Sequence, residues 1–574
     1  MLDKKSLQLQ YIVDEAGNKK AVIIPHSQFK ELLQDMATLA KLVEKGEKSG
    51  TKSQTMAPQI VTKERKAVKS MAPQTVAEEQ KSSEKQQHDW LNKMLKLPPH
   101  FVQDSSLFYK IQSALLMEMS DKQKPPIILQ APSGTGKSVM ANALVQDAKI
   151  RQTFAENIFW FHLGTEVEVL ANQITLIQAL GGNSTDIFDV EKATKRLGEL
   201  CITRRCLVIL DDVWEPEDIL AFHVGGKHYQ LLVTTSENNV LEVIQYFIKE
   251  AKNYTLKPFS EEQAIAFFAH SLAQPNVSVI PIDMKEMVRA CDYLPLALKL
   301  IANVARKGPL SKLENLLDRL LNEDYEFPNK YPRALMQALR LNVEALGEEG
   351  DYYITLAVFG DYSRIPESVV LILWHYLYQI REDKAKALIN ELAENGLLQI
   401  DDTSSHRYLS LHTFQHDYIS AESDLERLHG HLLAAYRIQC VHHGWISGPN
   451  DGYFFEYLCM HLHHAKRDNE LKSLLLDFDW LQNKLQATSI YALLNDYEWI
   501  ENKQVEEIKK ALYDAALLLV TEKQELANQL LDNLLGEKSS HNNKDIQALL
   551  NQARETSPNW RWQPQFPDKV KVKR

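Results

Sequence analysis

The sequence predicts an α/β nucleotide-binding domain in its first half and a mainly helical second half. The apolar run Ile127 to Leu129 leads into A-P-S-G-T-G-K-S at 131–138, with a helix-like stretch after it. A second apolar run, C-L-V-I-L-D-D-V-W at 206–214, ends in two carboxylates, as a buried parallel strand with ligands at its end would. Beyond residue 280 strand signals nearly vanish, which predicts helical domains there.

The segment at 131–138 has the strand–loop–helix setting of a phosphate-binding loop (P-loop). Small residues let backbone N–H groups curl around phosphate oxygens, and the following helix adds the positive end of its dipole. Ala131 stands where the motif begins with glycine, and a small residue still fits there. Lys137 is expected to reach the β- and γ-phosphates, and Ser138 to bind Mg²⁺. The predicted nucleotide-binding residues of the loop are Ser133, Gly134, Thr135, Gly136, Lys137, Ser138 and Val139.

The two carboxylates at 211–212 have separate predicted roles. Asp211 is expected to bind Mg²⁺, directly or through water, and Asp212 to orient an attacking water. Lys137 and Asp212 are therefore the predicted catalytic residues. The alternative is an acidic turn after a core strand, without a role in the site. The position of the two carboxylates, about seventy residues after a P-loop, favours the roles in binding Mg²⁺ and water.

Bulk composition excludes several classes of protein. The net charge of −11 argues against nucleic-acid binding by the chain as a whole. No apolar run reaches about 18 residues, and the N-terminus lacks an apolar signal core. Five cysteines without a C-x-x-C pair suit a reducing compartment, so we expect a cytoplasmic protein without a membrane span.

Composition shifts along the chain predict seven segments. Alternating strand-like and helix-like runs between 91 and 270 predict a parallel sheet with helices on both faces. The predicted segments are a hairpin-plus-helix module (1–44), a disordered linker with a repeated M-A-P-Q (45–90), the P-loop domain (91–270), a helical domain (271–332), a winged-helix domain (333–422), an α-helical arm (423–560) and a basic tail (561–574).

The N-terminal module is predicted from alternating apolar residues around D-E-A-G-N-K-K and from a helix that begins at Pro25. Its apolar helix face has too little chain of its own to cover it, so we expect it to pack on another copy or another domain. The pattern resembles the dimerising N-terminal half of small bacterial antitoxins.

Further segments follow the P-loop in a specific order: F-A-E-N-I-F-W-F-H-L-G (154–164), L-L-V-T-T-S (231–236), L-K-P-F-S-E-E-Q-A-I-A-F-F (256–268) and Y-L-P-L-A-L (293–298). Together with the P-loop and L-V-I-L-D-D-V-W, they resemble the NB-ARC module of the STAND class of P-loop ATPases. That class includes the apoptotic protease-activating factor family and plant disease-resistance proteins. The predicted segment 333–422 is similar to the family's winged-helix domain. The predicted segment 423–560 is similar to the α-solenoid arm of the family's bacterial members, here without a WD-repeat propeller.

The resemblance implies a nucleotide-controlled switch with Mg²⁺ as its metal. ADP would hold the domains closed, ATP would open them for assembly with protein partners or with further copies, and hydrolysis would reset the switch slowly. By resemblance, Pro295 would pack on the adenine side, and His412 would contact the β-phosphate of ADP.

Three positions depart from the family pattern. The adenine-side V-G-R is replaced by F-V-Q-D (101–104), the arginine that senses the γ-phosphate by Ser236, and the aspartate after the winged-helix histidine by Thr413. Loss of that arginine removes a charge-assisted contact, so ATP hydrolysis is expected to be weak unless Lys257 or Arg364 substitutes.

Two other functions stay open from the sequence. The chain could be a STAND-type transcriptional regulator that touches DNA through its lysine-bearing N-terminal module or its winged helix, although the third helix of that domain mixes both charge signs. It could also be a structural protein that keeps ADP permanently bound.

Overall fold

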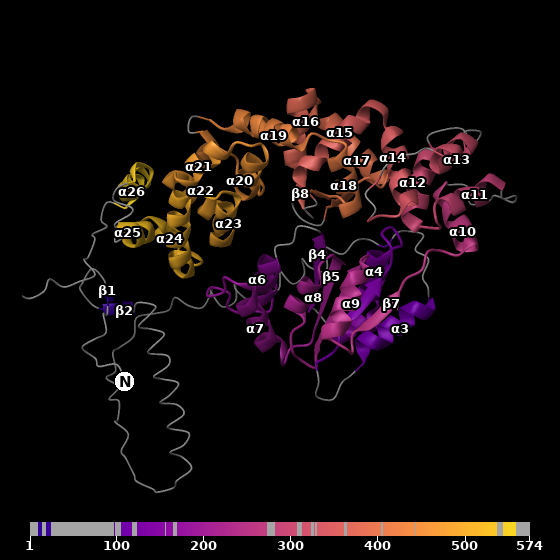
Figure 1. The fold of residues 1–574 in the computed structure, drawn as a ribbon, viewed down its shortest axis with the longest axis horizontal. Coiled ribbons are helices and arrows are strands. Elements are labelled where there is room, and N and C mark those ends of the chain that lie inside the picture. Colours follow the sequence, from indigo (N-terminus) through magenta and orange to yellow (C-terminus); the bar gives the residue numbers. More distant parts are fainter. Residues whose placement is uncertain are drawn as a thin grey trace, which may run out of the picture. The chain divides into compact units, whose positions relative to one another are not determined.

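The computed structural model describes residues 105–117, 123–154, 157–164, 169–272, 282–306, 313–322, 330–360, 364–402, 406–441, 444–535 and 543–557, with Leu97, Phe327 and the backbone of 10–13 and 19–23 (Figure 1). The chain divides into two compact units, one made of residues 1–73 with 561–574 and the other of residues 74–560.

The first unit contains the predicted hairpin. Strands β1 (Gln10–Val13) and β2 (Lys19–Ile23) pair antiparallel, which confirms the two strands. The predicted helix from Pro25, the linker at 45–90 and the tail at 561–574 lie outside the described residues.

The second unit contains the predicted parallel sheet. Its five strands lie in the order β4-β5-β6-β3-β7, and every neighbouring pair is parallel. The carboxyl ends of β3, β5 and β6 therefore meet at one edge, where ligands of such sheets bind. The strands are β3 (Ile127–Gln130), β4 (Ile158–Gly164), β5 (Cys206–Val213), β6 (Tyr229–Thr235) and β7 (Lys252–Thr255).

Helices cover both faces of this sheet because its strands are apolar on both sides. Leu207 and Ile209 of β5 pack with α3, α4 and α5, whereas Val208 and Leu210 pack with α6 to α9. The prediction of a doubly covered sheet is thus confirmed (Figure 1). The helices are α3 (Ser105–Leu116), α4 (Lys137–Gln146), α5 (Ala148–Phe154), α6 (Val169–Ala179), α7 (Val190–Cys201), α8 (Pro216–Phe222) and α9 (Asn238–Phe247).

Helices dominate the described residues after β7, as the sequence predicts. They are α10 (Glu261–Ser271), α11 (Ile282–Ala290), α12 (Pro295–Arg306), α13 (Leu313–Asn322), α14 (Arg333–Glu344), α15 (Gly350–Ile354), α16 (Glu367–Tyr378), α17 (Glu382–Glu394) and α18 (Thr413–Ala421). A small antiparallel sheet of β8 (Ile365–Pro366), β10 (Tyr408–Ser410) and β9 (Gln399–Asp401) interrupts them.

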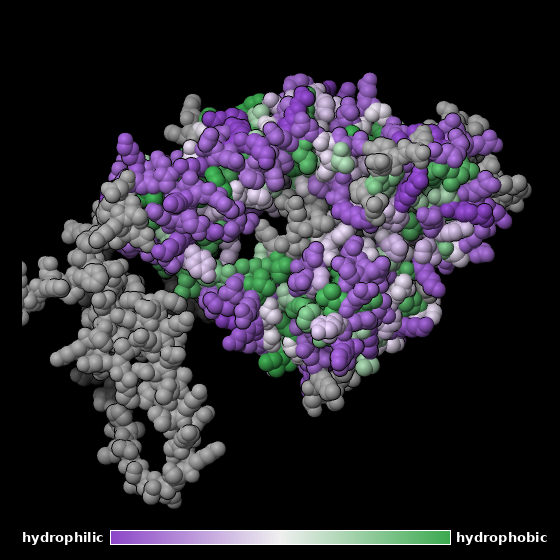
Figure 2. Space-filling view, viewed as in Figure 1, coloured by the Kyte–Doolittle hydropathy of each residue, from purple (hydrophilic) through white to green (hydrophobic). Residues whose placement is uncertain are grey.

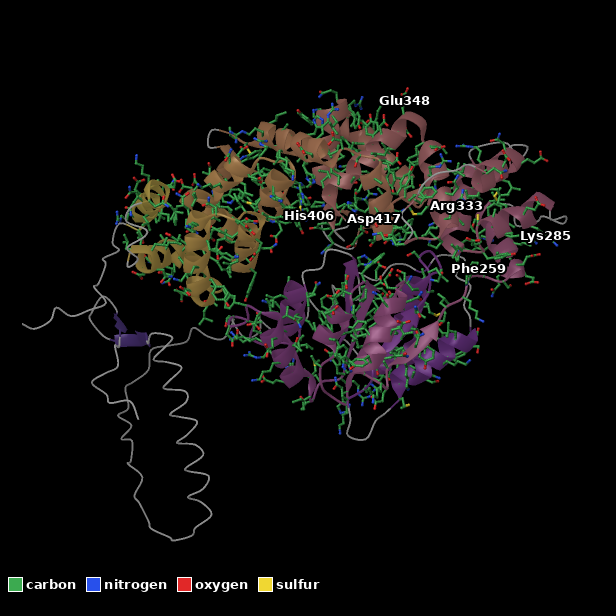
Figure 3. The ribbon with its side chains drawn as sticks, viewed as in Figure 1. Phe259, Lys285, Arg333, Glu348, His406 and Asp417 are labelled. Carbon is green, nitrogen blue, oxygen red and sulfur yellow. The ribbon has the colours of Figure 1, made fainter. Side chains whose placement is uncertain are left out.

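The described residues of the predicted arm (423–560) form a succession of helices that pack on their neighbours in the chain. These are α19 (Leu425–Gln439), α20 (Phe454–His464), α21 (Asp468–Leu475), α22 (Phe478–Ala487), α23 (Ile490–Asp496), α24 (Lys503–Leu519), α25 (Leu526–Leu535) and α26 (Lys544–Thr556). Their inner faces form a continuous apolar core, and hydrophilic residues dominate the surface that Figure 2 shows. Among the described helices, none is long and apolar enough to cross a membrane.

One charged pair is fully enclosed in this apolar core. The Nζ of Lys484 on α22 lies 2.8 and 2.9 Å from the two carboxylate oxygens of Asp496 on α23, and both side chains are buried. A buried charge without a partner is costly because water no longer solvates it.

Replacement of Asp496 by alanine should therefore destabilise the arm by about 3–5 kcal/mol, because it leaves the Lys484 ammonium unpaired. Glu498→Ala is the matched control. It removes the exposed partner of Lys509 and should cost about 0–1 kcal/mol. Hydrogen exchange of α20 to α23 in the full chain measures both changes, and equal effects would contradict the account.

Candidate functional site

The loop between β3 and α4 has the geometry of a phosphate-binding loop. Gly134 and Gly136 have φ angles of 83° and 101°, in the left-handed region that glycine adopts without strain. A Cβ on Gly134 would come 3.1 Å from a methyl carbon of Leu335 on α14, so a side chain would also crowd the neighbouring helix. The helix after the loop, α4, begins at Lys137.

The amine of Lys137 is folded back into this loop. Its Nζ donates to the carbonyl oxygen of Ala131 at 2.8 Å, and the side chain is buried. Burial lowers the pKa of Lys137, although attraction to Asp212, Asp211 and Glu237 opposes that shift. The loop thus holds a buried amine beside three carboxylates, at the place where a phosphate-binding lysine is expected.

Asp211 joins the end of β5 to the loop. Its Oδ1 accepts hydrogen bonds from the Ser138 hydroxyl at 2.8 Å and the Thr234 hydroxyl at 2.6 Å, and its Oδ2 lies 3.5 Å from Nδ1 of His162. Burial opposes ionisation of this carboxyl, but the interactions with His162, Thr234 and Ser138 outweigh it and keep the pKa of Asp211 below its ordinary value.

The oxygens of Ser138 and Asp211 suit Mg²⁺, which prefers hard oxygen ligands and takes few from the protein. In the described part of the chain, no group of three or more His, Cys, Asp or Glu side chains could hold a metal ion. Ser138 and Asp211 could thus hold a bound Mg²⁺ together with oxygens of phosphate or water.

Asp212 points away from Asp211, towards another region of the fold. Its φ of 58° is unusual for a residue other than glycine, and its N–H donates to the Thr234 hydroxyl at 2.9 Å. Its Oδ2 accepts from the indole of Trp214 at 3.3 Å and from the hydroxyl of Thr413 at 2.8 Å. Thr413 begins α18, so Asp212 connects the sheet domain to the region of residues 333–422.

The segment around Pro295 also reaches the loop. The N–H of Leu296, in the first turn of α12, donates to the carbonyl oxygen of Gly134 at 3.2 Å. Asp292 and Tyr293, just before this helix, both have left-handed φ angles, of 50° and 55°. Such paired conformations are costly and cluster at functional sites.

His412 lies between β10 and α18, next to Thr413. Its Nε2 accepts a hydrogen bond from the Gln399 amide at 2.7 Å. Burial lowers the pKa of His412 to about 4, and nearby His162 adds to the shift. The imidazole is therefore neutral near pH 7. It lies within electrostatic reach of Asp211 and Asp212, the two carboxylates at the end of β5.

The structure also locates the departures from the family pattern. The hydroxyl of Ser236 is buried and has no hydrogen-bond partner among the residues that the structure describes. Arg364, one predicted substitute for the missing arginine, instead pairs with Asp401 at 3.5 Å and lies over the Tyr408 ring. Lys257, the other, is exposed. The 101–104 segment lies outside the described residues.

Sequence reasoning missed three residues of this site: His162, Thr234 and Trp214. Each of them stands at or near the carboxyl end of a strand, β4, β6 or β5. Polar side chains at the ends of buried parallel strands are the signal that could have found the first two. The hydrogen bond of Trp214 to Asp212 has no comparable signal in the sequence.

Two family models match the chain. Residues 107–277 match the NB-ARC domain, and residues 425–545 match the APAF-1 helical domain. The first match contains the P-loop, β5 and β6, and the second contains most of the arm.

Curated relatives agree with these matches. The chain is 25% identical to apoptotic protease-activating factor 1 of Homo sapiens over 402 residues, which is 66% of this chain and 31% of that protein. It is 26% identical to the putative disease resistance protein RGA4 of Solanum bulbocastanum over 307 residues, which is 50% of this chain and 30% of that protein. In both cases the match spans less than a third of the relative.

The lowered pKa of His412 predicts a pH dependence. The folded protein binds fewer protons than the unfolded chain between pH 6.5, the ordinary pKa, and about 4. The contribution of His412 to stability is therefore complete above pH 6.5 and is lost as the pH falls through that range. The thermal midpoint of unfolding should decrease from pH 7 to pH 5 by a smaller amount in His412→Gln than in the wild type. Equal decreases in the two proteins would contradict the prediction.

Proposed function

We propose that this chain, which carries an NB-ARC domain of the STAND class of P-loop ATPases, is a nucleotide-controlled switch. Bound ADP would favour the closed arrangement of its regions, and exchange for ATP would favour an open one. The open form would assemble with protein partners or with further copies, and slow ATP hydrolysis would restore the closed form.

The observation that carries this proposal is that two further regions contact the P-loop and the strand end beside it. The P-loop belongs to the sheet domain, Leu296 to the predicted helical domain, and Thr413 to the predicted winged-helix domain. A ligand bound beside Lys137 would adjoin all three. It could therefore change their relative free energies, as a switch requires.

The residues have separate roles in this proposal. Backbone N–H groups of residues 133–139 and the Lys137 amine would bind the phosphates, while Ser138 and Asp211 would hold Mg²⁺. When bound, the metal would neutralise phosphate charge. Pro295 would border the adenine side, and His412 would bond the β-phosphate of ADP through its imidazole.

Hydrolysis would be slow for two reasons that these contacts suggest. Ser236 has no positive charge to offer a terminal phosphate, where the family pattern has arginine. Asp212, the proposed water-orienting residue, already accepts hydrogen bonds from Trp214 and Thr413. The proposed enzyme activity is therefore that of a weak, regulatory ATPase.

The charges on α17 favour protein partners over DNA for the winged-helix domain. Lys386 pairs with Glu382, and Arg381 pairs with Asp383, so these cations are neutralised locally. Sequence-independent DNA binding depends on cations that are available to phosphates. A DNA-binding role through the N-terminal module remains the alternative proposal.

We expect purified wild-type protein to carry ADP, identified by mass spectrometry after denaturation. Its particle mass should rise after exchange into a non-hydrolysable ATP analogue with Mg²⁺, because ATP favours the assembling form. Lys137→Ala should abolish nucleotide binding in calorimetry, since it removes the buried amine at the loop.

Lys149→Ala is the matched control, because this lysine is exposed on α5. It should bind nucleotide and assemble like the wild type. A mass that is the same in every nucleotide state would contradict the switch and favour a structural protein with permanent ADP. Retention of specific DNA fragments at physiological salt would favour the regulator.

A further inference from the structure

His162 is a polar residue in an otherwise apolar strand, and it lies beside the predicted metal ligand. Strands β4 and β5 are parallel neighbours whose register pairs His162 with Asp211. Paired residues of adjacent strands project from the same face of the sheet, so the two side chains meet. The Nδ1 of His162 lies 3.5 Å from Oδ2 of Asp211.

This contact completes a ring of donors around the Asp211 carboxylate. The hydroxyls of Ser138 and Thr234 bond to Oδ1, and His162 faces Oδ2. The last torsion of an aspartate side chain is only weakly fixed by its own rotamer preference. A donor on each side therefore decides how the carboxylate plane lies relative to Ser138.

We propose that His162 is a positioning residue for the metal, holding the Asp211 carboxylate in the orientation that binds Mg²⁺ beside Ser138. This inference rests on the proposed nucleotide site and names a residue that sets its affinity for the metal. Side chains that hold a metal ligand in place typically change metal affinity by about 10–100-fold when removed.

The position of the donor nitrogen makes the inference testable. In histidine, Nδ1 is bonded directly to Cγ, and the amide nitrogen of asparagine is bonded to Cγ in the same way. The amide nitrogen of glutamine is one bond farther along, in the place of Nε2. Asparagine at 162 can therefore reproduce the donor that faces Asp211, whereas glutamine and leucine cannot.

The experiment measures calorimetric affinities of the full chain, freed of bound nucleotide, for a non-hydrolysable ATP analogue, with MgCl₂ and with EDTA. The ratio of the two affinities reports the contribution of the metal. We expect His162→Leu and His162→Gln to lower this ratio about tenfold, and His162→Asn to keep it within about threefold of the wild type. Affinities in EDTA should be the same for all four proteins, since the inference concerns only the metal.

Every other outcome contradicts either the positioning role of His162 or the proposed function of the chain. The positioning role would be overturned if the affinity ratio were equal in all four proteins, or if His162→Asn and His162→Gln lowered it equally. It would also be overturned if the affinity of the wild type did not depend on Mg²⁺. A loss of affinity in EDTA that matches the loss in MgCl₂ would make His162 merely structural. Failure of the wild type to bind either ADP or the analogue would instead overturn the proposed function itself. If His162→Leu does not fold, the Asn and Gln variants still separate these outcomes.

Discussion

Two adjacent carboxylates at the end of β5 point in different directions, and the arrangement of the site depends on that divergence. Asp211 bonds to Ser138 of the P-loop, whereas Asp212, with its left-handed backbone, bonds to Thr413 at the start of α18. One strand end therefore contacts both the predicted metal site and a region about two hundred residues away. In the proposed switch, a change at the phosphates would reach that region through the peptide unit that joins Asp211 to Asp212.

The sheet makes this possible because its core is rigid and its edge is polar. Leu207 to Leu210 are fully buried between two layers of helices, so β5 has little freedom to move. Its neighbours supply His162 and Thr234, and Thr234 bonds to both Asp211 and the Asp212 backbone. The strand thus acts as a fixed support for the polar groups at its end.

The sequence predicted the parts of this site that are local in the chain, because the P-loop and the acidic strand follow from motif and apolar pattern. It also located Thr413, but only as a departure from a family pattern. That its hydroxyl donates to Asp212 could not be foreseen, since the contact joins distant residues whose meeting depends on the packing of whole domains. His162 was missed because a single polar residue in an apolar run is usually a packing feature. The roles of Pro295 and His412 in nucleotide binding stay predictions.

The hydrogen bond between Asp212 and Thr413 joins the sheet domain to α18, and a distance measurement between spin labels tests this connection most directly. Labels at Tyr246→Cys on α9 and Glu382→Cys on α17 would use exposed sites, with the partly exposed Cys440 replaced by serine. In ADP, the account predicts a single narrow distance for the wild type and for Thr413→Ser, which keeps the hydroxyl, and a broadened distribution for Thr413→Val. Identical distributions for all three proteins would contradict it.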